Sequence, residues 1–252
     1  MEWEAPAIVL DARPYGEGGA LVTVLTEDHG AYRALARGGN ARAQLSLWQR
    51  GNLVQARWVA RLADQLGSVS AELVHAGAAS AMDDPLELSI LTAACAVAEG
   101  ALPEREPHPL VFAGLVRLIA SLSSGFDVLP DLIRWEAVLL AELGYGLDLE
   151  SCALSGATSG LSYVSPRTGR AVARDAAGVW AERLLPLPGF LVGSNRAEAA
   201  DCRDGLRLTG HFLARDAFGQ HHRPVPEARL MLYDRVSALA EVSSAGGAVD
   251  DA

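Results

Sequence analysis

Apolar and polar residues alternate with the period of β-strands between residues 7 and 73. Within residues 53–61, Val54, Ala56 and Trp58 fall on one face and Arg57 falls on the other. Gly-rich and Pro-containing turns separate these segments. The expected strands cover residues 7–13, 21–26, 31–37, 53–61 and 67–73. Five short strands in this length predict a small barrel such as an OB-fold.

From residue 84 onward, apolar residues recur at helical spacing. Asp84 followed by Pro85 is typical of a helix start. Helices are expected over residues 86–100, 110–122, 132–143, 175–185, 196–214 and 226–240. The sequence therefore predicts an α+β fold: a barrel over residues 1–80 and a helical domain over residues 81–242. Residues 151–174, rich in Ser, Gly and Thr, form an insertion, and a disordered tail is expected over residues 243–252.

The composition is that of a globular protein with a sizeable core. Half of the 252 residues are hydrophobic and 21% are charged. No apolar run reaches the roughly 18 residues of a membrane span, and the acidic first residues do not have the pattern of a signal peptide. The three cysteines are too few and too widely spaced for a disulfide framework. A cytoplasmic location is expected.

The charges are distributed unevenly along the chain. The net charge is −10 and every cation is arginine, whose planar guanidinium suits phosphate and base stacking. Residues 1–80 hold seven arginines against eight acidic residues, and the rest of the chain holds 14 against 23. Between His29 and Ala63 there is no acidic residue, but there are six arginines: Arg33, Arg37, Arg42, Arg50, Arg57 and Arg61. This segment is either a nucleic-acid surface or chance clustering on a solvated face.

OB-type barrels bind single strands through a basic groove and exposed aromatic rings. The aromatic candidates are Tyr15, Tyr32, Trp48 and Trp58. For Trp58 and Tyr32, a place in the barrel core explains the residue as well as base stacking does. Trp48 lies in a loop-like stretch and is expected to be exposed. The predicted DNA-binding set is therefore the six arginines together with Tyr32 and Trp48.

No motif for catalysis or for a cofactor is present. Residues 16–19 are Gly-rich but lack dinucleotide-binding spacing, and neither a phosphate-binding loop nor a Gly-x-Ser-x-Gly elbow occurs. The adjacent His221 and His222 fit a surface loop. Cys152 has no second cysteine nearby, although a zinc site needs four ligands. The sequence predicts a protein that is not an enzyme, with no cofactor and no metal.

Several short stretches are similar to one known family. They are Ala12–Glu17, Leu25–Gly30, Ala36–Gly39, Glu142–Leu149 with the following Cys152, and Ser165–Val172. Their order and spacing over nearly the whole chain resemble the RecO family of bacterial DNA repair and recombination mediator proteins. The resemblance implies an OB-fold, a helical domain and a zinc-finger-like insertion near residues 152–174. Because this chain retains only Cys152 there, the insertion is expected to have lost its metal ligands, with packing in place of coordination.

The resemblance also implies a function and partners. These are binding to single- and double-stranded DNA, annealing of complementary strands, and help in loading a recombinase onto DNA coated with single-strand-binding protein. The implied partners are RecR and the C-terminal tail of single-strand-binding protein. Arg117 and Arg134, on apolar helices, are candidates for contacting that acidic tail, although a plain solvated helix face explains them as well.

Two other functions remain open from the sequence. One is a protein-interaction scaffold that acts through RecR or single-strand-binding protein with little direct DNA binding. In that case the barrel arginines would pair with acidic residues of a partner. The other is a hydrolase whose site has no recognisable motif, which would require polar side chains to converge in one pocket.

Overall fold

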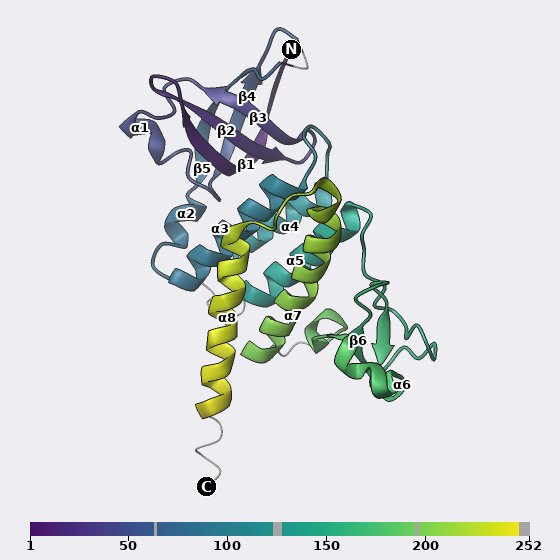
Figure 1. The fold of residues 1–252 in the computed structure, drawn as a ribbon. Helices are drawn as coiled ribbons and strands as arrows, with labels where there is room; N and C mark the ends of the chain where they lie inside the picture. The colour runs from purple at the N-terminus through teal and green to yellow at the C-terminus, as the bar shows by residue number, and fades with distance from the viewer. Residues whose placement is uncertain (63–64, 123–127, 195–196, 247–252) are drawn as a thin grey trace. The chain divides into compact units, whose positions relative to one another are not determined.

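A computed structural model describes residues 1–62, 65–122, 128–194 and 197–246 of the chain (Figure 1). The chain separates into two compact units, Met1–Val128 and Leu129–Ala252. The first unit holds a β-barrel followed by helices, and the second holds helices and a small sheet. The α+β class predicted from the sequence is confirmed. The domain boundary predicted at residue 80 stays a prediction.

The N-terminal barrel is closed by five strands in the order β1-β2-β3-β5-β4. The strands are β1 (Glu2–Tyr15), β2 (Gly19–Thr26), β3 (Gly30–Ala36), β4 (Leu53–Val59) and β5 (Ser68–His75). All neighbours are antiparallel except β3 and β5, which pair in parallel at Leu35 and Ser68. This arrangement confirms the OB-like barrel. The bounds of β2 to β5 lie close to the expected ones, whereas β1 extends beyond the expected residues 7–13 at both ends.

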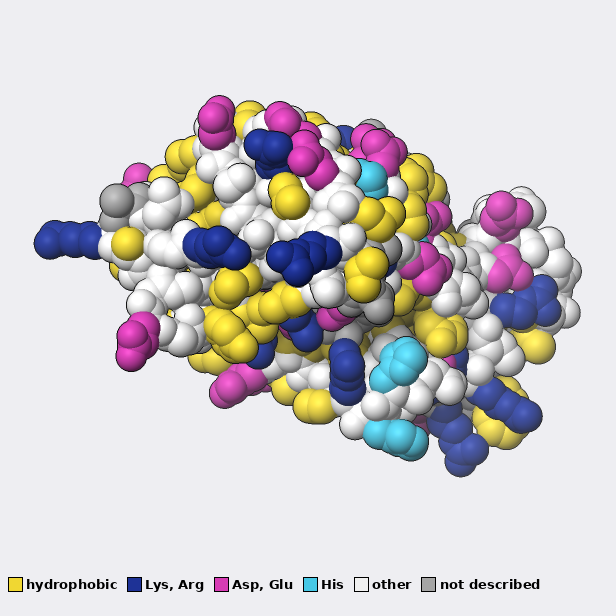
Figure 2. Space-filling model, turned by 90° about the horizontal axis from the view of Figure 1, so that it is seen from above, with side chains coloured by type: hydrophobic (Ala, Val, Ile, Leu, Met, Phe, Trp, Pro, Cys, Tyr) yellow, Lys and Arg dark blue, Asp and Glu magenta, His cyan; other side chains and the backbone are white. Residues whose placement is uncertain are grey.

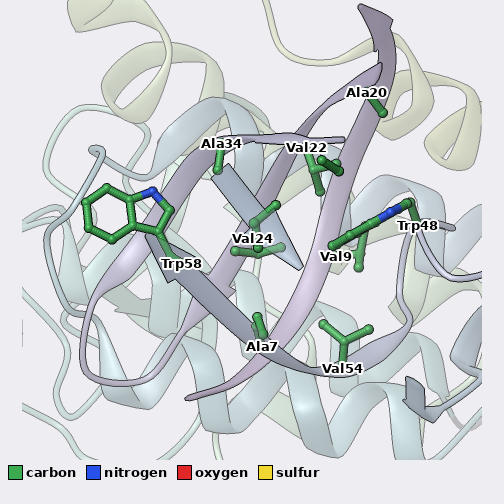
Figure 3. Close-up of a cluster of buried hydrophobic side chains, with 12 residues drawn as sticks. Ala7, Val9, Ala20, Val22, Val24, Ala34, Trp48, Val54 and Trp58 are labelled. Carbon is green, nitrogen blue, oxygen red and sulfur yellow. The ribbon is translucent and has the colours of Figure 1, made fainter. Parts of the chain in front are cut away.

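Alternation along each strand fills the barrel with small and branched side chains. The buried core consists of Ala7, Val9, Ala20, Val22, Val24, Ala34, Ala36, Trp48, Val54, Ala56, Trp58 and Val69. In Figure 3 the two tryptophans lie on opposite sides of this aliphatic cluster. The apolar face predicted for residues 53–61 is therefore the inward face, which leaves Arg57 exposed.

Four helices complete the first unit: α1 (Arg42–Leu45), α2 (Gly77–Ser80), α3 (Pro85–Ala101) and α4 (Pro109–Ala120). Asp84 caps α3, because its carboxylate accepts hydrogen bonds from the N–H groups of Leu86 at 2.6 Å and Glu87 at 3.3 Å. Helix α3 packs against β1, where the Cys95 thiol donates to the Val9 carbonyl at 3.9 Å.

The segment between α3 and α4 packs against the β2–β3 turn. Arg105 N–H donates to the Ala31 carbonyl at 2.8 Å, and Ala31 forms a parallel bridge with Glu104. A Cβ atom at Gly30 would lie 2.0 Å from the Glu106 carbonyl oxygen, so this close approach requires glycine. The contact holds the turn firmly against residues 104–106.

The second unit contains three long helices, α5 (Val128–Glu142), α7 (Ala199–Phe212) and α8 (Glu227–Gly246). A π-helical turn, Leu213–Ala217, extends α7, and a 3₁₀ turn follows at Gly219–His221. Glu136 of α5 and Arg229 of α8 are both buried and form a bidentate ion pair, with Nη2 to Oε2 at 2.9 Å. Thr209 of α7 donates to the same carboxylate, so the three helices share one satisfied polar centre.

The insertion between α5 and α7 is a three-stranded sheet in the order β7-β6-β8. Its elements are β6 (Leu161–Val164), β7 (Ala171–Ala173), α6 (Arg174–Ala177), β8 (Leu185–Pro186) and two 3₁₀ helices, Gly178–Arg183 and Gly189–Leu191. The buried residues Cys152, Val172, Ala173 and Ala177 form its small core. This sheet begins within the insertion expected over residues 151–174 and continues beyond it, because β8 lies at Leu185–Pro186.

Two sequence predictions need adjustment. The helix expected over residues 175–185 is divided: α6 ends at Ala177, and Gly178, with φ of +50°, leads into a 3₁₀ helix that ends at Arg183. Helix α8 continues to Gly246, beyond the expected start of the tail at residue 243, and residues 247–252 lie outside the described chain. Among the helices of the described residues, none is long and apolar enough to cross a membrane.

Candidate nucleic-acid interface

A groove of about 490 Å³ lies where the β1–β2 turn meets the segment after β3. Its lining residues are Tyr15, Glu17, Gly18, Gly19, Leu35, Arg37, Gly38, Asn40 and Ala41. In OB-folds, the loop between the first two strands is one of the loops that bind oligonucleotides. The groove therefore occupies a position at which this fold commonly takes a ligand.

Glycines in left-handed conformations shape the two loops of the groove. Gly16 and Gly18 have φ of +61° and +122°, and Gly38 has φ of +70°. Asn40 N–H donates to the Gly18 carbonyl at 3.2 Å, which joins the two loops directly. The glycine-rich stretch has no chemical motif, but it forms one wall of a built groove.

Arg37 and Arg42 are the predicted DNA-binding residues at or next to this groove that remain available. Arg37 lines the groove and Arg42 begins the short helix after it. Both side chains are exposed, and neither forms an ion pair within the described part of the chain. Tyr15, 56% exposed, lies at the same rim. Two free guanidinium groups and an exposed ring are therefore present, together with one acidic neighbour, Glu17.

Three other predicted arginines are bound to acidic residues of the same unit. Arg33 contacts Glu99 at 3.5 Å and Glu104 at 3.4 Å. Arg50 Nε donates to Asp11 at 3.0 Å, and Arg57 contacts Glu2 at 2.9 Å. These acids come from β1 and from the α3 region, far from the arginine segment in sequence. The arginine-rich segment has no acidic residue of its own, but folding brings acidic side chains from elsewhere in the unit next to three of its arginines.

Arg61 lies just after β4, in the loop that leads to β5. Its side chain is exposed and has no ionic partner among the residues that the structure describes. At the far end of this loop, the Gly67 carbonyl accepts from Leu35 N–H at 3.1 Å. The β4–β5 loop is therefore anchored next to a strand residue that lines the groove.

Tyr32 belongs to an aromatic cluster at the β1–β4 seam. Its ring lies edge-on to Trp3 and Trp58, each at 5.2 Å between centroids, and His29 stacks on Trp3 at 4.8 Å. The Arg105 guanidinium lies 5.1 Å above the Tyr32 ring. Because Tyr32 is half-buried and covered in this way, it does not line the groove at Arg37.

The expectation that Trp48 is exposed is wrong. Trp48 is 5% exposed and belongs to the barrel core, although its segment lacks strand periodicity. Asn52 donates from its side-chain nitrogen to the carbonyls of Ser46 and Leu47, which holds this loop against the barrel. A ring buried in this way has no free face for a base. Its assignment to DNA binding therefore lacks support in the geometry.

On the face shown in Figure 2, arginine does not form one continuous basic patch. Figure 2 shows arginine, acidic and hydrophobic side chains interspersed on the face that it presents. Of the two partner-binding candidates, Arg117 is exposed on α4. Arg134 on α5 instead contacts Asp131 at 2.8 Å and lies 5.3 Å over the Phe190 ring.

The insertion does not provide a zinc site. In the described ranges, no three His, Cys, Asp or Glu side chains form a group that could hold a metal ion. Around Cys152, backbone groups take the place of ligands: the N–H of Ala173 donates to Sγ at 3.2 Å and that of Ser155 at 3.4 Å. These hydrogen bonds lower the pKa of Cys152 from 9.0 to about 6, against the raising effect of burial. The residues present therefore fit a buried thiolate rather than a metal centre.

The barrel with its loop groove, the helical region and the sheet insertion define an OB-fold protein with a helical C-terminal part. The family described as Recombination protein O N terminal matches residues 1–76, and Recombination protein O C terminal matches residues 82–223. Together these matches cover most of the chain. The chain belongs to the RecO family.

Curated relatives agree with this assignment. The chain is 60% identical to a protein named DNA repair protein RecO from Granulibacter bethesdensis, over 96% of this chain and 98% of that protein. It is 60% identical to the protein of the same name from Acidiphilium cryptum, over 94% and 96% of the two chains. The corresponding protein from Gluconacetobacter diazotrophicus is 58% identical over 95% and 96%.

Proposed function

We propose that this chain acts in recombinational DNA repair by binding single- and double-stranded DNA and annealing complementary strands. In this proposal it also helps to load the recombinase onto DNA coated with single-strand-binding protein. The observation that carries the proposal is the groove at the β1–β2 loop, where the exposed Tyr15 and the unpaired Arg37 lie together. Its membership of a family of proteins named for DNA repair supports the same conclusion.

The groove contains the two kinds of group that sequence-independent single-strand binding uses. Arg37 and Arg42 would neutralise phosphates and release counterions, and Tyr15 would stack on a base. Annealing requires only that the repulsion between two strands be screened while they are held close together. No acid, base or nucleophile is needed for that process.

The test is the affinity for a labelled single-stranded oligonucleotide, measured by fluorescence anisotropy across a range of salt concentrations. Each phosphate contact contributes about −0.7 to the log–log slope. Charge reversal at Arg37 and Arg42 should flatten the slope by about 1.4 and weaken binding by on the order of tenfold. Reversal at the exposed Arg207 and Arg235 of the second unit makes the same change in net charge and is the matched control.

A second candidate is a scaffold that acts through protein partners such as RecR. The net charge of −10 and the mixed charges of the face in Figure 2 favour it. Absence of oligonucleotide binding even at low salt would support this function and contradict the first. Equal affinity of the Arg37/Arg42 variant and the wild type would remove the groove from the proposal.

The acidic tail of single-strand-binding protein is the proposed peptide partner. On α4, the exposed Leu110 lies seven residues before the exposed Arg117 and hence on the same helix face. An apolar side chain beside a guanidinium suits a peptide that ends in acidic and apolar residues. Retention of a labelled tail peptide by the wild type, with loss in Arg117→Glu, would test this contact.

A further inference from the structure

The insertion carries a second groove, of about 380 Å³. Its lining residues are Ala153, Leu154, Ser165, Thr168, Arg170, Val172, Ala177, Trp180, Arg183 and Leu184. Trp180 is 56% exposed and Leu154 is 68% exposed, so large apolar surfaces face solvent here. Exposed apolar surface of this kind in a small module marks a binding site more often than chance.

The charged side chains that line this groove are basic, and the exposed Asp175 and Glu182 lie next to it in sequence. Residues 151–174 contain Arg167, Arg170 and Arg174 and no acidic residue. The lining includes two arginines and no acid. The Arg183 guanidinium lies 5.3 Å over the Trp180 ring and has no ionic partner in the described chain. Arg170 contacts Asp148 at 3.1 Å, and both side chains are about half exposed.

The wall of the groove is held rigidly by the β6–β7 turn. Gly169 N–H donates to the Ser165 carbonyl and Ser165 N–H donates to the Arg170 carbonyl, both at 2.9 Å. Arg215 donates to the carbonyls of Pro166 and Arg167, which fixes the turn to the helical region of the same unit. The groove is therefore preformed, and a ligand would not have to order this loop.

We propose that this groove is a second contact for single-stranded nucleic acid, which holds the complementary strand during annealing. A base would stack on Trp180, whose ring is already partnered by the Arg183 guanidinium on one side. Phosphates would contact Arg183 and would replace Asp148 at Arg170, an exchange favoured by the weakness of exposed ion pairs. Hydroxyl groups of Ser165 and Thr168 would provide additional hydrogen bonds.

The inference rests on the proposed annealing function and explains a requirement of it. Annealing brings two strands together, whereas the barrel groove offers a site for one. The barrel segment and the insertion are the two longest acid-free stretches of the chain that contain several arginines. Single-stranded nucleic acid combines negatively charged phosphates with flat bases. The phosphates suit the arginines of the insertion groove, and the bases suit its exposed Trp180 indole.

Trp180 supplies a direct readout of binding at this site. The other four tryptophans are buried or half-buried, whereas Trp180 is exposed. Addition of an oligothymidine to the full chain should quench the intrinsic fluorescence, and Trp180→Phe should abolish most of that quenching. No quenching in the wild type, or equal quenching in Trp180→Phe, would overturn the proposal.

The functional test is the annealing rate of two complementary labelled oligonucleotides. We expect Trp180→Ala combined with Arg183→Ala to slow annealing by about tenfold, within the range of one lost stacking contact. Arg207→Ala removes an exposed cation elsewhere in the same unit and should anneal at the wild-type rate. Thermal unfolding followed by circular dichroism would verify that each variant is folded.

The outcomes separate the two proposals. If the wild type neither binds nor anneals oligonucleotides, the proposed function itself fails. If Arg37/Arg42 charge reversal weakens binding while the Trp180/Arg183 variant anneals like the wild type, only the second contact is wrong. Quenching of Trp180 by an acidic apolar peptide, with none by oligothymidine, would assign the groove to a protein partner and overturn the inference.

Discussion

The two compact units differ in how far their ion pairs are buried. In the barrel unit, ion pairs lie at the surface: Arg33 and Arg50 remain 42% exposed while they contact acidic residues. The second unit also has exposed pairs, such as Arg170 with Asp148, but there Arg229 and Glu136 form a pair fully inside the helices, with side chains 2% and 0% exposed. Two cysteines also differ between the units. The Cys95 thiol of the first unit donates a hydrogen bond, whereas the Cys152 sulfur of the second unit accepts two.

This difference shows which charges are available to a ligand. A half-exposed arginine can exchange its carboxylate for a phosphate, because exposed pairs contribute little stability. A buried pair cannot be separated without leaving a charge uncompensated in the interior. The barrel therefore contains arginines that a polyanion can compete for, whereas Arg229 serves the fold alone.

The largest expected effect comes from breaking the buried pair. Arg229→Met leaves the Glu136 carboxylate inside the helices without its ionic partner and should lower the free energy of unfolding by about 3–5 kcal/mol. Urea unfolding followed by circular dichroism measures this loss. The double variant Arg229→Met with Glu136→Leu should recover most of it, because no buried charge remains. A loss below about 1 kcal/mol for the single variant would contradict the difference between the units.

Cys152 and Cys95 differ in pKa, so they provide a test of how stability depends on pH. The pKa of Cys152 is lowered to about 6 in the folded protein, from 9.0. Its contribution to stability is therefore complete above about pH 9 and is lost as the pH falls toward 6. Unfolding free energies measured between pH 6 and 9 should rise with pH in the wild type and rise less in Cys152→Ala.

Cys95→Ala is the control for the pH test. Burial raises the pKa of Cys95 to about 12, so this thiol stays protonated between pH 6 and 9. Below about pH 8 this thiol is protonated in the unfolded chain as well, so its removal should leave the slope of stability against pH unchanged between about pH 6 and 8, whatever it does to stability itself. A slope that vanishes in Cys95→Ala rather than in Cys152→Ala would reverse the assignment.

A smaller effect is expected from the two core tryptophans of the barrel. The indole N–H of Trp58 donates to the Leu66 carbonyl at 3.1 Å, whereas that of Trp48 is buried without a hydrogen-bond partner among the described residues. Trp58→Phe should lower stability by about 1 kcal/mol more than Trp48→Phe. Chemical unfolding of the two variants compares them directly, and equal losses would show that the Trp58 hydrogen bond contributes nothing.

The smallest effect concerns Arg33, which contacts both Glu99 and Glu104. Because a phosphate would have to displace two carboxylates at once from its guanidinium, Arg33→Gln should change the affinity for single-stranded oligonucleotides by less than about twofold. Anisotropy titrations beside Arg37→Gln make the comparison. A loss at Arg33 as large as that at Arg37 would mean that phosphate displaces both acids, and it would place Arg33 in the DNA-binding set.

The strands and the long helices could be predicted because their signals are local. Alternation of side chains located the barrel strands, and Asp84 with Pro85 marked the start of α3. The short α6 was misjudged because Gly178 breaks the helical pattern at a point where apolar spacing continues. The burial of Trp48 had no local signal, since a loop rather than a strand places it in the core.

The candidate site could be predicted only in part. The sequence placed Arg37 and Arg42 among six candidate arginines, but it could not show that Asp11 and Glu99 bind Arg50 and Arg33 across 39 and 66 residues of chain. The groove in the insertion was missed for a similar reason. Trp180 and Arg170 are unremarkable in sequence; they line one groove because β7 and α6 fold between them.

The contact between Gly30 and residues 104–106 has a consequence for how the chain folds. It ties the β2–β3 hairpin to the connection between α3 and α4, so that local opening of one should open the other. Amide hydrogens of the hairpin and of α3 are then expected to exchange together, as one cooperative unit. A fragment comprising residues 1–128 would keep this contact, whereas one ending at residue 80 would lose it.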